Sequence, residues 1–396
     1  MTTTDVVAGA FAAAGFVSPD YGGWCLDAVL PGAAAALARP LGLDLDRLPD
    51  GAAEAQARLD LPDASRVCVV LVDGLGHEML TERAGHAPFL RSHLAGARTL
   101  TSGYPSTTAA SMGLFGTGCA PGRTGLIGYT VRNPETGGLA NLISWEGAGE
   151  ATSWQREETV FERLAAAGAP VSFVGPANFA GSGLTEAALR GASFVRAERL
   201  EDRVDAALYE LSAPGLVYLY WRDVDKAGHQ FGWRSPEWGD ALAEVDRELA
   251  RLARSLPAGT LLLVTADHGM VDVDHGLLVD VATTPALARD VVLVAGEPRA
   301  SHVHVRPGTA PDVAARWRQV LGDRALVALH DDAVAAGWFG PVAEHVDALV
   351  GDVVVAARGR AGVVDSRTQT PHSLTLKGMH GSLTPGEMLV PLIVTG

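Results

Sequence analysis

Apolar runs of strand length recur along the chain and alternate with segments of helical period. The first run, 67–72, is apolar throughout, and further runs follow at 170–175, 215–221 and 260–266. Strands that are apolar on both faces lie inside parallel sheets covered by helices. Between the runs, positions 237–254 carry leucine and valine at helical spacing. The pattern predicts an α/β fold with a mostly parallel central sheet flanked by helices on both faces.

The same patterning suggests how the chain is divided. Residues 1 to about 60 are rich in Ala and Leu at helical spacing and predict helices that pack on the core. The pattern loosens at 295–377, which we expect to form a smaller α+β cap. The catalytic core would then comprise 1–294 and 378–396. Residues 121–156, rich in Gly, Asn, Thr and Trp, predict a long excursion over the site.

Three of the apolar runs are followed by side chains that can bind metal ions, and one more such side chain precedes the last apolar run. Ligands gather at the carboxyl ends of parallel strands, so these side chains are expected to meet at one sheet edge. Each alone could be a helix cap or a loop residue, but together they suit zinc or a similar divalent ion. The candidates are Asp73, Asp225, His229, Asp267, His268 and His380.

A helix is predicted within the segment SGYPSTTAASMGLFGTG. It begins near Pro105 and ends at Gly116 and Gly118. Thr107 and Thr108 therefore lie at a helix N-terminus, where free backbone N–H groups favour an anion.

Composition and charge narrow the function classes. The chain has 396 residues, of which 47% are hydrophobic and 19% charged, as in ordinary globular proteins. Its net charge of -15 argues against a nucleic-acid-binding surface and would repel an anionic substrate unless a bound cation compensates. Cys25, Cys68 and Cys119 form no CxxC pair and indicate reduced thiols. The N-terminus lacks a basic region typical of a signal peptide, and no apolar stretch approaches ~20 residues. We expect a soluble, cytoplasmic protein without membrane contact.

These motifs, in this order, resemble the alkaline phosphatase superfamily, and most closely its nucleotide pyrophosphatase/phosphodiesterase branch. The resemblance rests on VDG, a Pro-Ser-x-Thr segment opening a helix, D-x-x-x-H, DHGM and a late HG, and spans about 66–396 outside the insertion. It implies two divalent metal ions, zinc above all, with Mn2+ or another ion as alternatives. Thr108, three residues after Pro105, would be the nucleophile and form a phospho-threonine. One ion would be surrounded by Asp73, Thr108, Asp267 and His268, and the other by Asp225, His229 and His380.

Several assignments have rivals in the sequence. Thr107 competes with Thr108, and Asp223 with Asp225, although the D-x-x-x-H spacing favours the latter. A second Asp-His pair at 274–275 does not follow a buried strand directly. A C-x-P-x-R motif typical of sulfatases lies at 119–123, past the predicted helix rather than at its start.

The substrate side of the resemblance is less complete. Ala109 stands where the phosphodiesterase branch has an aromatic residue that stacks on a nucleobase. The family's phosphate-binding Asn has no direct counterpart, so Tyr129, Asn133 or a backbone N–H would take that role.

The resulting hypothesis is a two-metal phosphoric ester hydrolase acting on a small-molecule phosphate ester or anhydride. Phosphonoacetate hydrolase-like and phosphomonoesterase activities are alternatives within the superfamily, and a catalytically inactive metal-binding protein is an alternative of another class. Activity is expected to fall below about pH 6, because histidine ligands become protonated. The sequence leaves the oligomeric state open.

Overall fold

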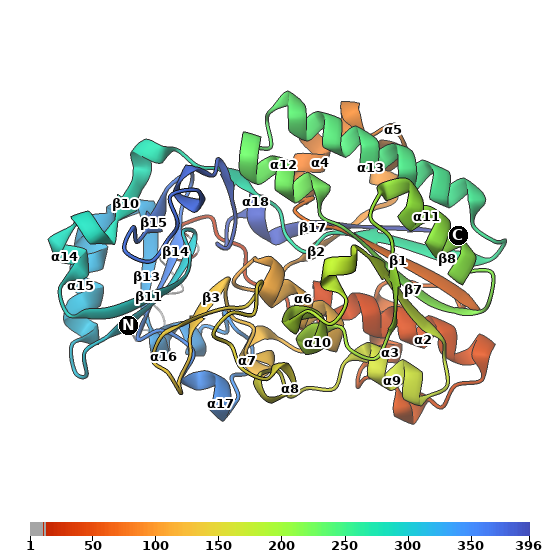
Figure 1. Ribbon diagram of the computed structural model, residues 1–396, viewed down its shortest axis with the longest axis horizontal. Coiled ribbons are helices and arrows are strands. Elements are labelled where there is room, and N and C mark those ends of the chain that lie inside the picture. The colour runs from red at the N-terminus through yellow and green to blue at the C-terminus, as the bar shows by residue number, and fades with distance from the viewer. Residues whose placement is uncertain (1–10, 12) are drawn as a thin grey trace.

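The computed structural model describes residue 11 and residues 13–396. The helical region predicted at residues 1 to about 60, and the N-terminal segment considered as a signal peptide, therefore lie partly outside the described residues. A seven-stranded sheet in the order β2-β17-β8-β1-β7-β5-β6 forms the centre (Figure 1). Strand β17 pairs antiparallel with both of its neighbours, and every other pairing within this sheet is parallel. Its strands are β1 (Arg66–Val72), β2 (Arg98–Thr101), β5 (Val171–Gly175), β6 (Ser193–Arg196), β7 (Gly215–Trp221), β8 (Thr260–Thr265) and β17 (Leu389–Thr395).

Helices cover both faces of this sheet, as the apolar runs require (Figure 1). One face carries α4 (His77–Glu82), α5 (Pro88–His93), α11 (Leu200–Glu210), α12 (Asp223–Phe231) and α13 (Pro236–Ser255). The other carries α2 (Val29–Leu41), α3 (Ala52–Arg58), α6 (Thr108–Thr117), α9 (Val160–Ala166) and α10 (Gly183–Ala188). Strands β7 and β8 are buried along their whole length. The predicted fold class is confirmed.

Strand register places the candidate ligands. Val72 at the end of β1 lies opposite Trp221 of β7, and the Asp73 amide donates to the Trp221 carbonyl at 2.8 Å. On the other side, Leu71 lies opposite Thr265 of β8. The segments that follow these three strands therefore emerge side by side at one edge of the sheet.

A second, antiparallel sheet forms a smaller unit, seen on the left of Figure 1. It has its own apolar core around Trp317 of α15 (Ala310–Leu321), which is fully buried. Its strands, in spatial order, are β11 (Val291–Glu297), β12 (Ala300–Val305), β14 (Val353–Ala357) and β13 (Ala325–Leu329). The cap boundary predicted at residue 295 thus falls inside β11.

A buried ion pair connects the two units. Arg299, in the turn between β11 and β12, binds Glu387 of α18 (Pro385–Met388) with two of its three nitrogens, Nε to Oε1 at 3.0 Å and Nη2 to Oε2 at 2.7 Å. Neither side chain is exposed to solvent. Glu387 Oε1 also accepts from the Ser382 amide at 3.0 Å, two residues after His380. The pair therefore ties the cap to the loop that carries a candidate ligand.

The excursion predicted at 121–156 has more secondary structure than a long loop. It contains α7 (Pro121–Thr124), the hairpin of β3 (Thr130–Arg132) and β4 (Leu139–Asn141), and α8 (Ala151–Trp154). The Thr130 hydroxyl donates to the Gly296 carbonyl of β11 at 2.9 Å, so the hairpin is attached to the second sheet. In the described part of the chain, every helix is too short or too polar to cross a bilayer.

Candidate metal centre and active site

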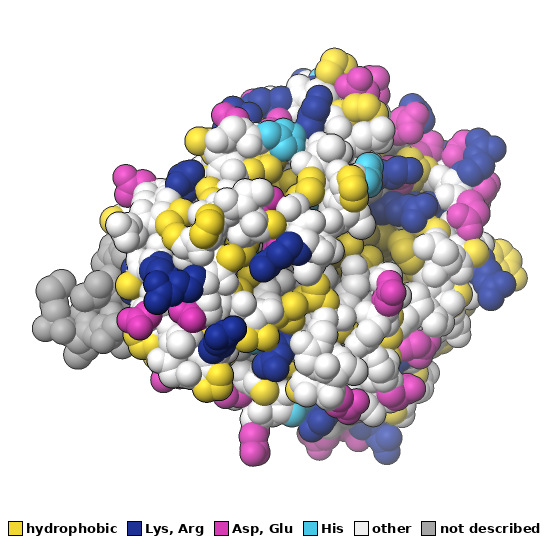
Figure 2. All heavy atoms as spheres, turned by 60° about the vertical axis from the view of Figure 1, so that its left-hand side comes forward, with side chains coloured by type: hydrophobic (Ala, Val, Ile, Leu, Met, Phe, Trp, Pro, Cys, Tyr) yellow, Lys and Arg dark blue, Asp and Glu magenta, His cyan; other side chains and the backbone are white. Residues whose placement is uncertain are grey.

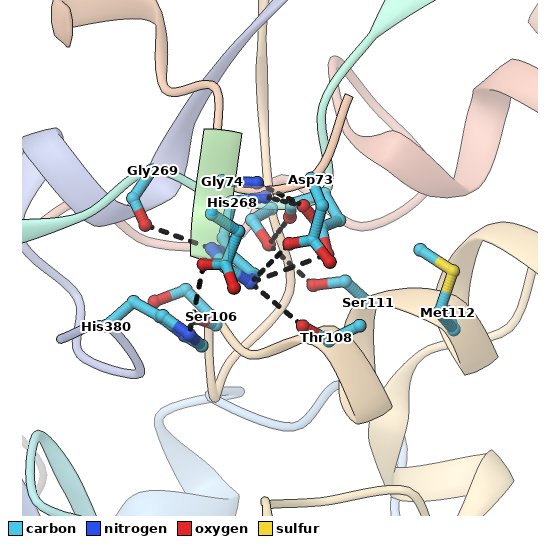
Figure 3. Close-up of polar contacts among 12 residues, drawn as sticks. Asp73, Gly74, Ser106, Thr108, Ser111, Met112, His268, Gly269 and His380 are labelled. Carbon is cyan, nitrogen blue, oxygen red and sulfur yellow. Dashed lines mark hydrogen bonds and ion pairs between the residues drawn. The ribbon is translucent and has the colours of Figure 1, made fainter. Parts of the chain in front are cut away.

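Segments far apart in the chain converge at the carboxyl edge of the central sheet (Figure 3). Asp73 follows β1, and Asp225 with His229 lies on α12, directly after β7. Asp267 and His268 follow β8. His380 lies in the loop before α18, and Thr108 begins α6. The structure brings together all seven residues expected from the sequence, namely Asp73, Thr108, Asp225, His229, Asp267, His268 and His380.

The first group is centred on His268. Its Nε2 lies 3.5 Å from Asp73 Oδ1, 3.4 Å from Asp267 Oδ2 and 3.2 Å from the Thr108 hydroxyl. His268 and Asp267 are fully buried. Two carboxylates and a hydroxyl therefore face a single imidazole nitrogen.

The second group joins His229, His380 and Asp225. His229 Nε2 lies 3.4 Å from Asp225 Oδ2 and 3.3 Å from His380 Nε2, while His380 Nε2 lies 3.9 Å from Asp225 Oδ1. Asp225 also falls within ligand distance of Asp73 and His268. It thus lies between the two groups.

The carboxylates present oxygens that no protein group satisfies. Asp73 Oδ1, Asp225 Oδ1 and Asp267 Oδ2 are buried without a hydrogen-bond partner. The other Asp267 oxygen accepts from the amides of Gly74 and His268, both at 3.0 Å. Buried polar atoms are normally paired. Three unpaired carboxylate oxygens at one point therefore fit a cation.

The histidines are oriented in the manner of metal ligands. Each Nδ1 lies against a backbone carbonyl: that of Gly378 for His229, Ser106 for His380 and Gly269 for His268, at 2.7, 2.9 and 3.0 Å. A carbonyl can only accept, so Nδ1 carries the proton and the Nε2 lone pair is free. This arrangement is common for ligating histidines.

The pKa shifts within the cluster also indicate that a positive charge is missing from it. Burial, with the neighbouring charges of Asp267 and Asp225, raises the pKa of Asp73 well above its usual range. Burial also raises the pKa of Asp267. Burial beside His268 and His229 lowers the pKa of His380 well below its usual range. A divalent cation here would favour the ligating forms, carboxylate and neutral imidazole.

Tyr220 orients one of these carboxylates and was not anticipated from the sequence. Its hydroxyl donates to Asp73 Oδ2, which leaves Oδ1 for the metal centre. Tyr220 lies near the end of β7, where a buried hydroxyl within an apolar strand must find a partner. That requirement was the available signal, but the sequence does not identify the partner.

Replacing Tyr220 with phenylalanine is expected to weaken metal binding about 10- to 100-fold, since Asp73 would lose the partner that orients it. Metal titration of the apoprotein measures the change. Tyr218→Phe is the matched control, because its hydroxyl contacts Met112 Sδ at 3.7 Å and no candidate ligand. Equal affinities of the two variants would contradict this role for Tyr220.

The structure separates the two threonines. Thr108 is the first residue of α6 and its hydroxyl points to His268, whereas Thr107 is the N-cap and is almost fully buried (Figure 3). No side chain caps this helix start, so its first amides are open to an anion. Cys119, of the sulfatase-like motif, follows Gly118 at the opposite end of α6.

The remaining rivals lie outside the centre. Asp223 Oδ2 lies 3.6 Å from Arg203 Nη1, and Asp274 caps a short 3-10 helix by accepting from the Gly276 amide. His275 Nε2 contacts the Leu376 carbonyl at 3.1 Å. Asp223, Asp274 and His275 therefore take no part in the group of converging ligands.

The two expected phosphate partners differ in position. Tyr129 lines the cavity above the metal centre and is 44% exposed. Asn133 is buried and organises its own turn: Nδ2 donates to the Gly147 carbonyl at 2.7 Å and Oδ1 accepts from the Glu135 amide at 2.8 Å. The structure does not bring Asn133 to the site, because the excursion folds as a hairpin instead of lying over the ligands as a loop.

A cavity of about 820 Å³ opens over the centre. Much of its wall is apolar, and Figure 2 shows hydrophobic side chains in a hollow of the visible face, with basic side chains beside it. The apolar lining includes Met112, Ile143, Phe173, Phe179, Leu184 and Leu189. The cavity is thus large enough for an organic group larger than phosphate alone.

Glu297, at the end of β11, brings a buried carboxyl from the cap to the start of α6. Its Oε2 accepts from the Tyr129 amide at 2.7 Å, while Oε1 has no partner. Burial raises the pKa of Glu297 from 4.5 to about 8, an effect partly offset by the hydrogen bond from the Tyr129 amide and by the nearby Thr107 hydroxyl.

This carboxyl gives stability a defined pH dependence. Between about pH 4.5 and 8 the folded chain retains a proton that the unfolded chain releases. Its contribution is therefore fully present below pH 4.5 and is lost as pH rises to about 8. Glu297→Gln is expected to remove this dependence. Urea unfolding of both metal-free proteins across the window checks it, and a pH-independent difference would contradict it.

Comparison with known proteins adds a family and a fold. The family described as Type I phosphodiesterase / nucleotide pyrophosphatase matches residues 67–383. Ectonucleotide pyrophosphatase/phosphodiesterase family member 5 of Homo sapiens is 32% identical over 91 residues, 18% of this chain and 19% of that protein. A phosphopentomutase of Anaeromyxobacter sp. (strain K) is 38% identical over 116 residues, 28% of either protein. The matches thus span less than a third of these curated relatives.

Solved structures share the fold over most of the chain. Murine ectonucleotide pyrophosphatase / phosphodiesterase 5 has a TM-score of 0.66 at 17% identity, covering 84% of this chain and 88% of that one. An inactive threonine-to-alanine variant of that protein, in complex with AMP, has a TM-score of 0.65 at the same identity and coverage. Phosphonoacetate hydrolase from Sinorhizobium meliloti 1021, in complex with phosphonoformate, has a TM-score of 0.64 at 20% identity, covering 84% and 90%.

Proposed function

The chain belongs to the type I phosphodiesterase / nucleotide pyrophosphatase family, and on that premise we propose that it hydrolyses phosphoric esters or anhydrides through a phospho-threonine at a two-metal centre. One observation carries the proposal: unpaired carboxylate oxygens, free imidazole nitrogens and the Thr108 hydroxyl meet at one sheet edge. The murine relative is described as inactive when one of its threonines is replaced by alanine, which agrees with a threonine nucleophile here.

The ligand set suits two divalent ions, zinc above all, with Mn2+ as an alternative. When bound, the ions would supply the positive charge and Lewis acidity that activate a hydroxyl and stabilise phosphoryl oxygens. Asp73, Asp267 and His268 would hold one beside Thr108, and Asp225, His229 and His380 the other.

The chain itself supplies the nucleophile and part of the phosphate site. The Thr108 oxygen forms a bond to phosphorus and its proton passes to water, while the bond from phosphorus to the leaving oxygen breaks. The open amides at the start of α6 bind the phosphoryl oxygens, and the helix dipole favours their negative charge. Water then cleaves the Thr108–phosphorus bond, and the threonine oxygen recovers a proton.

A nucleobase stacked beside the nucleophile is not supported, because Ala109 is fully buried and has no aromatic ring. The relative turnover of diesters, monoesters and phosphonates is therefore the measurement that identifies the substrate class. We propose a diester or anhydride as the substrate, in keeping with the family.

The test is elemental analysis of the purified protein followed by a substrate panel. The panel comprises bis(4-nitrophenyl) phosphate, 4-nitrophenyl phosphate, nucleotides and phosphonoacetate. We expect two divalent ions per chain and fastest turnover of the diester or an anhydride. Two ions without turnover of any compound would instead favour an inactive metal-binding protein. Fastest turnover of the monoester or phosphonate would replace the diester proposal with the corresponding activity.

A further inference from the structure

One face of α12 lines the cavity with both metal-ligand candidates and basic side chains. Arg222, Asp225, Lys226 and His229 all reach the cavity, and their spacing of i, i+3, i+4 and i+7 puts them on one side of the helix. Asp225 and His229 belong to the metal centre. Arg222 and Lys226 therefore place two positive charges on the cavity wall beside the phosphoryl site.

Neither cation has an acidic partner among the described residues. Asp223, the nearest acid in sequence outside the metal centre, is directed to Arg203 instead. The carboxylates on the cavity wall are Asp73 and Asp225, and both face the metal centre. A cation at the start of a helix also opposes the helix dipole, so helix stability does not explain Arg222.

Arg222 lies against an aromatic part of the cavity wall. The Arg222 guanidinium lies over the Phe179 ring, 5.7 Å from its centroid, and Phe179 itself packs edge-on against Tyr220. Leu184 and Leu189 also line the cavity. A ligand bound at the metal centre would therefore meet both an apolar surface and two positive charges without acidic partners within the same cavity.

We propose that Arg222 and Lys226 bind a second anionic group of the substrate, so that the group esterified to the scissile phosphoryl is apolar and itself carries a carboxylate or phosphate. The inference rests on the proposed function and narrows its substrate class. If the two cations only offset the negative charge of the chain, they would attract every anion equally. The proposal instead requires that a second anionic group on the ligand increase its affinity.

Calorimetry with metal-loaded protein tests this with phenylphosphonate and 4-carboxyphenylphosphonate, which share the phosphonate and the ring. We expect the carboxylate to tighten binding roughly fivefold or more in the native sequence. Lys226→Met and Arg222→Met should each reduce this gain while binding phenylphosphonate, and circular dichroism checks their folding. Lys377→Met is the matched control: it removes the same charge, but Lys377 lines a separate hollow, and the gain should persist. No gain in the native sequence, or an equal gain in all three variants, would overturn the inference.

A second readout depends on neither activity nor substitution. The chain contains two lysines, Lys226 and Lys377. Acetylation mapped by mass spectrometry should be slowed at Lys226 by the carboxylated ligand several-fold more than by phenylphosphonate, and at Lys377 by neither. Equal effects of both ligands on Lys226 would overturn the inference. Ester turnover without selective protection would leave the proposed function intact, whereas selective protection without turnover of any ester would overturn the proposed function alone.

Discussion

Replacing Thr108 with alanine is expected to lower kcat by about 10³-fold or more, because the oxygen that attacks phosphorus is removed. The fold should persist, since Thr108 makes no capping bond and alanine suits a first helical turn. Metal content is expected to remain at two ions, because aspartates and histidines supply the other ligands. Steady-state kinetics with a 4-nitrophenyl ester, together with elemental analysis, measures both quantities.

Two further variants isolate the role of this hydroxyl. Thr108→Ser keeps a nucleophilic oxygen and should retain measurable turnover and a phospho-enzyme trapped by acid quench. Thr107→Ala removes the neighbouring hydroxyl, which does not cap α6 and faces Glu297 instead, and should lower kcat by less than about tenfold. Unchanged turnover in Thr108→Ala, or a larger loss in Thr107→Ala, would transfer the nucleophile to Thr107.

Asp225→Asn is expected to reduce bound metal below two ions per chain and to lower kcat by about 10³-fold or more. Asp225 lies within ligand distance of both groups, so losing its charge weakens two sites at once. The substitution keeps the side-chain volume, and Oδ1 has no protein partner whose loss would unfold the chain.

Asp223→Asn provides the control on the same helix with the same change in charge. Its carboxylate is 40% exposed and lies near Arg203, 3.6 Å away, so metal content should remain at two ions and kcat within about tenfold. Full metal occupancy in Asp225→Asn would contradict the two-group arrangement. Metal loss in Asp223→Asn alone would reverse the assignment.

Much of this site follows from strand ends. The runs that form β1, β7 and β8 are apolar on both faces, and parallel strands deliver the residues after them to one edge. Asp73 and Asp267 could therefore be placed from the sequence. His380 follows no such strand; its position before the last apolar run made it a candidate, and the family resemblance assigned it to the second ion.

Other contacts depend on long-range packing that no local pattern specifies. Tyr220 lies 147 positions from its partner Asp73, and Glu297 lies 168 positions from Tyr129. The family resemblance made Asn133 one of three alternatives for binding the phosphate, but its amide closes a turn within the hairpin. Strand pairing within the central sheet sets the first of these contacts, and packing of the excursion against the second sheet sets the other. Hydrophobic periodicity does not encode either of them.

The Arg299–Glu387 pair restricts how this enzyme can diversify. A chain in which the cap was exchanged for another module that again buries this junction would leave the Glu387 carboxylate without its cationic partner, a change that costs about 3–5 kcal/mol. Grafting at this junction should succeed only when Glu387 is neutralised at the same time. New specificities in this lineage are therefore expected to arise by point substitution along α12 and the facing wall, with the cap inherited as a unit.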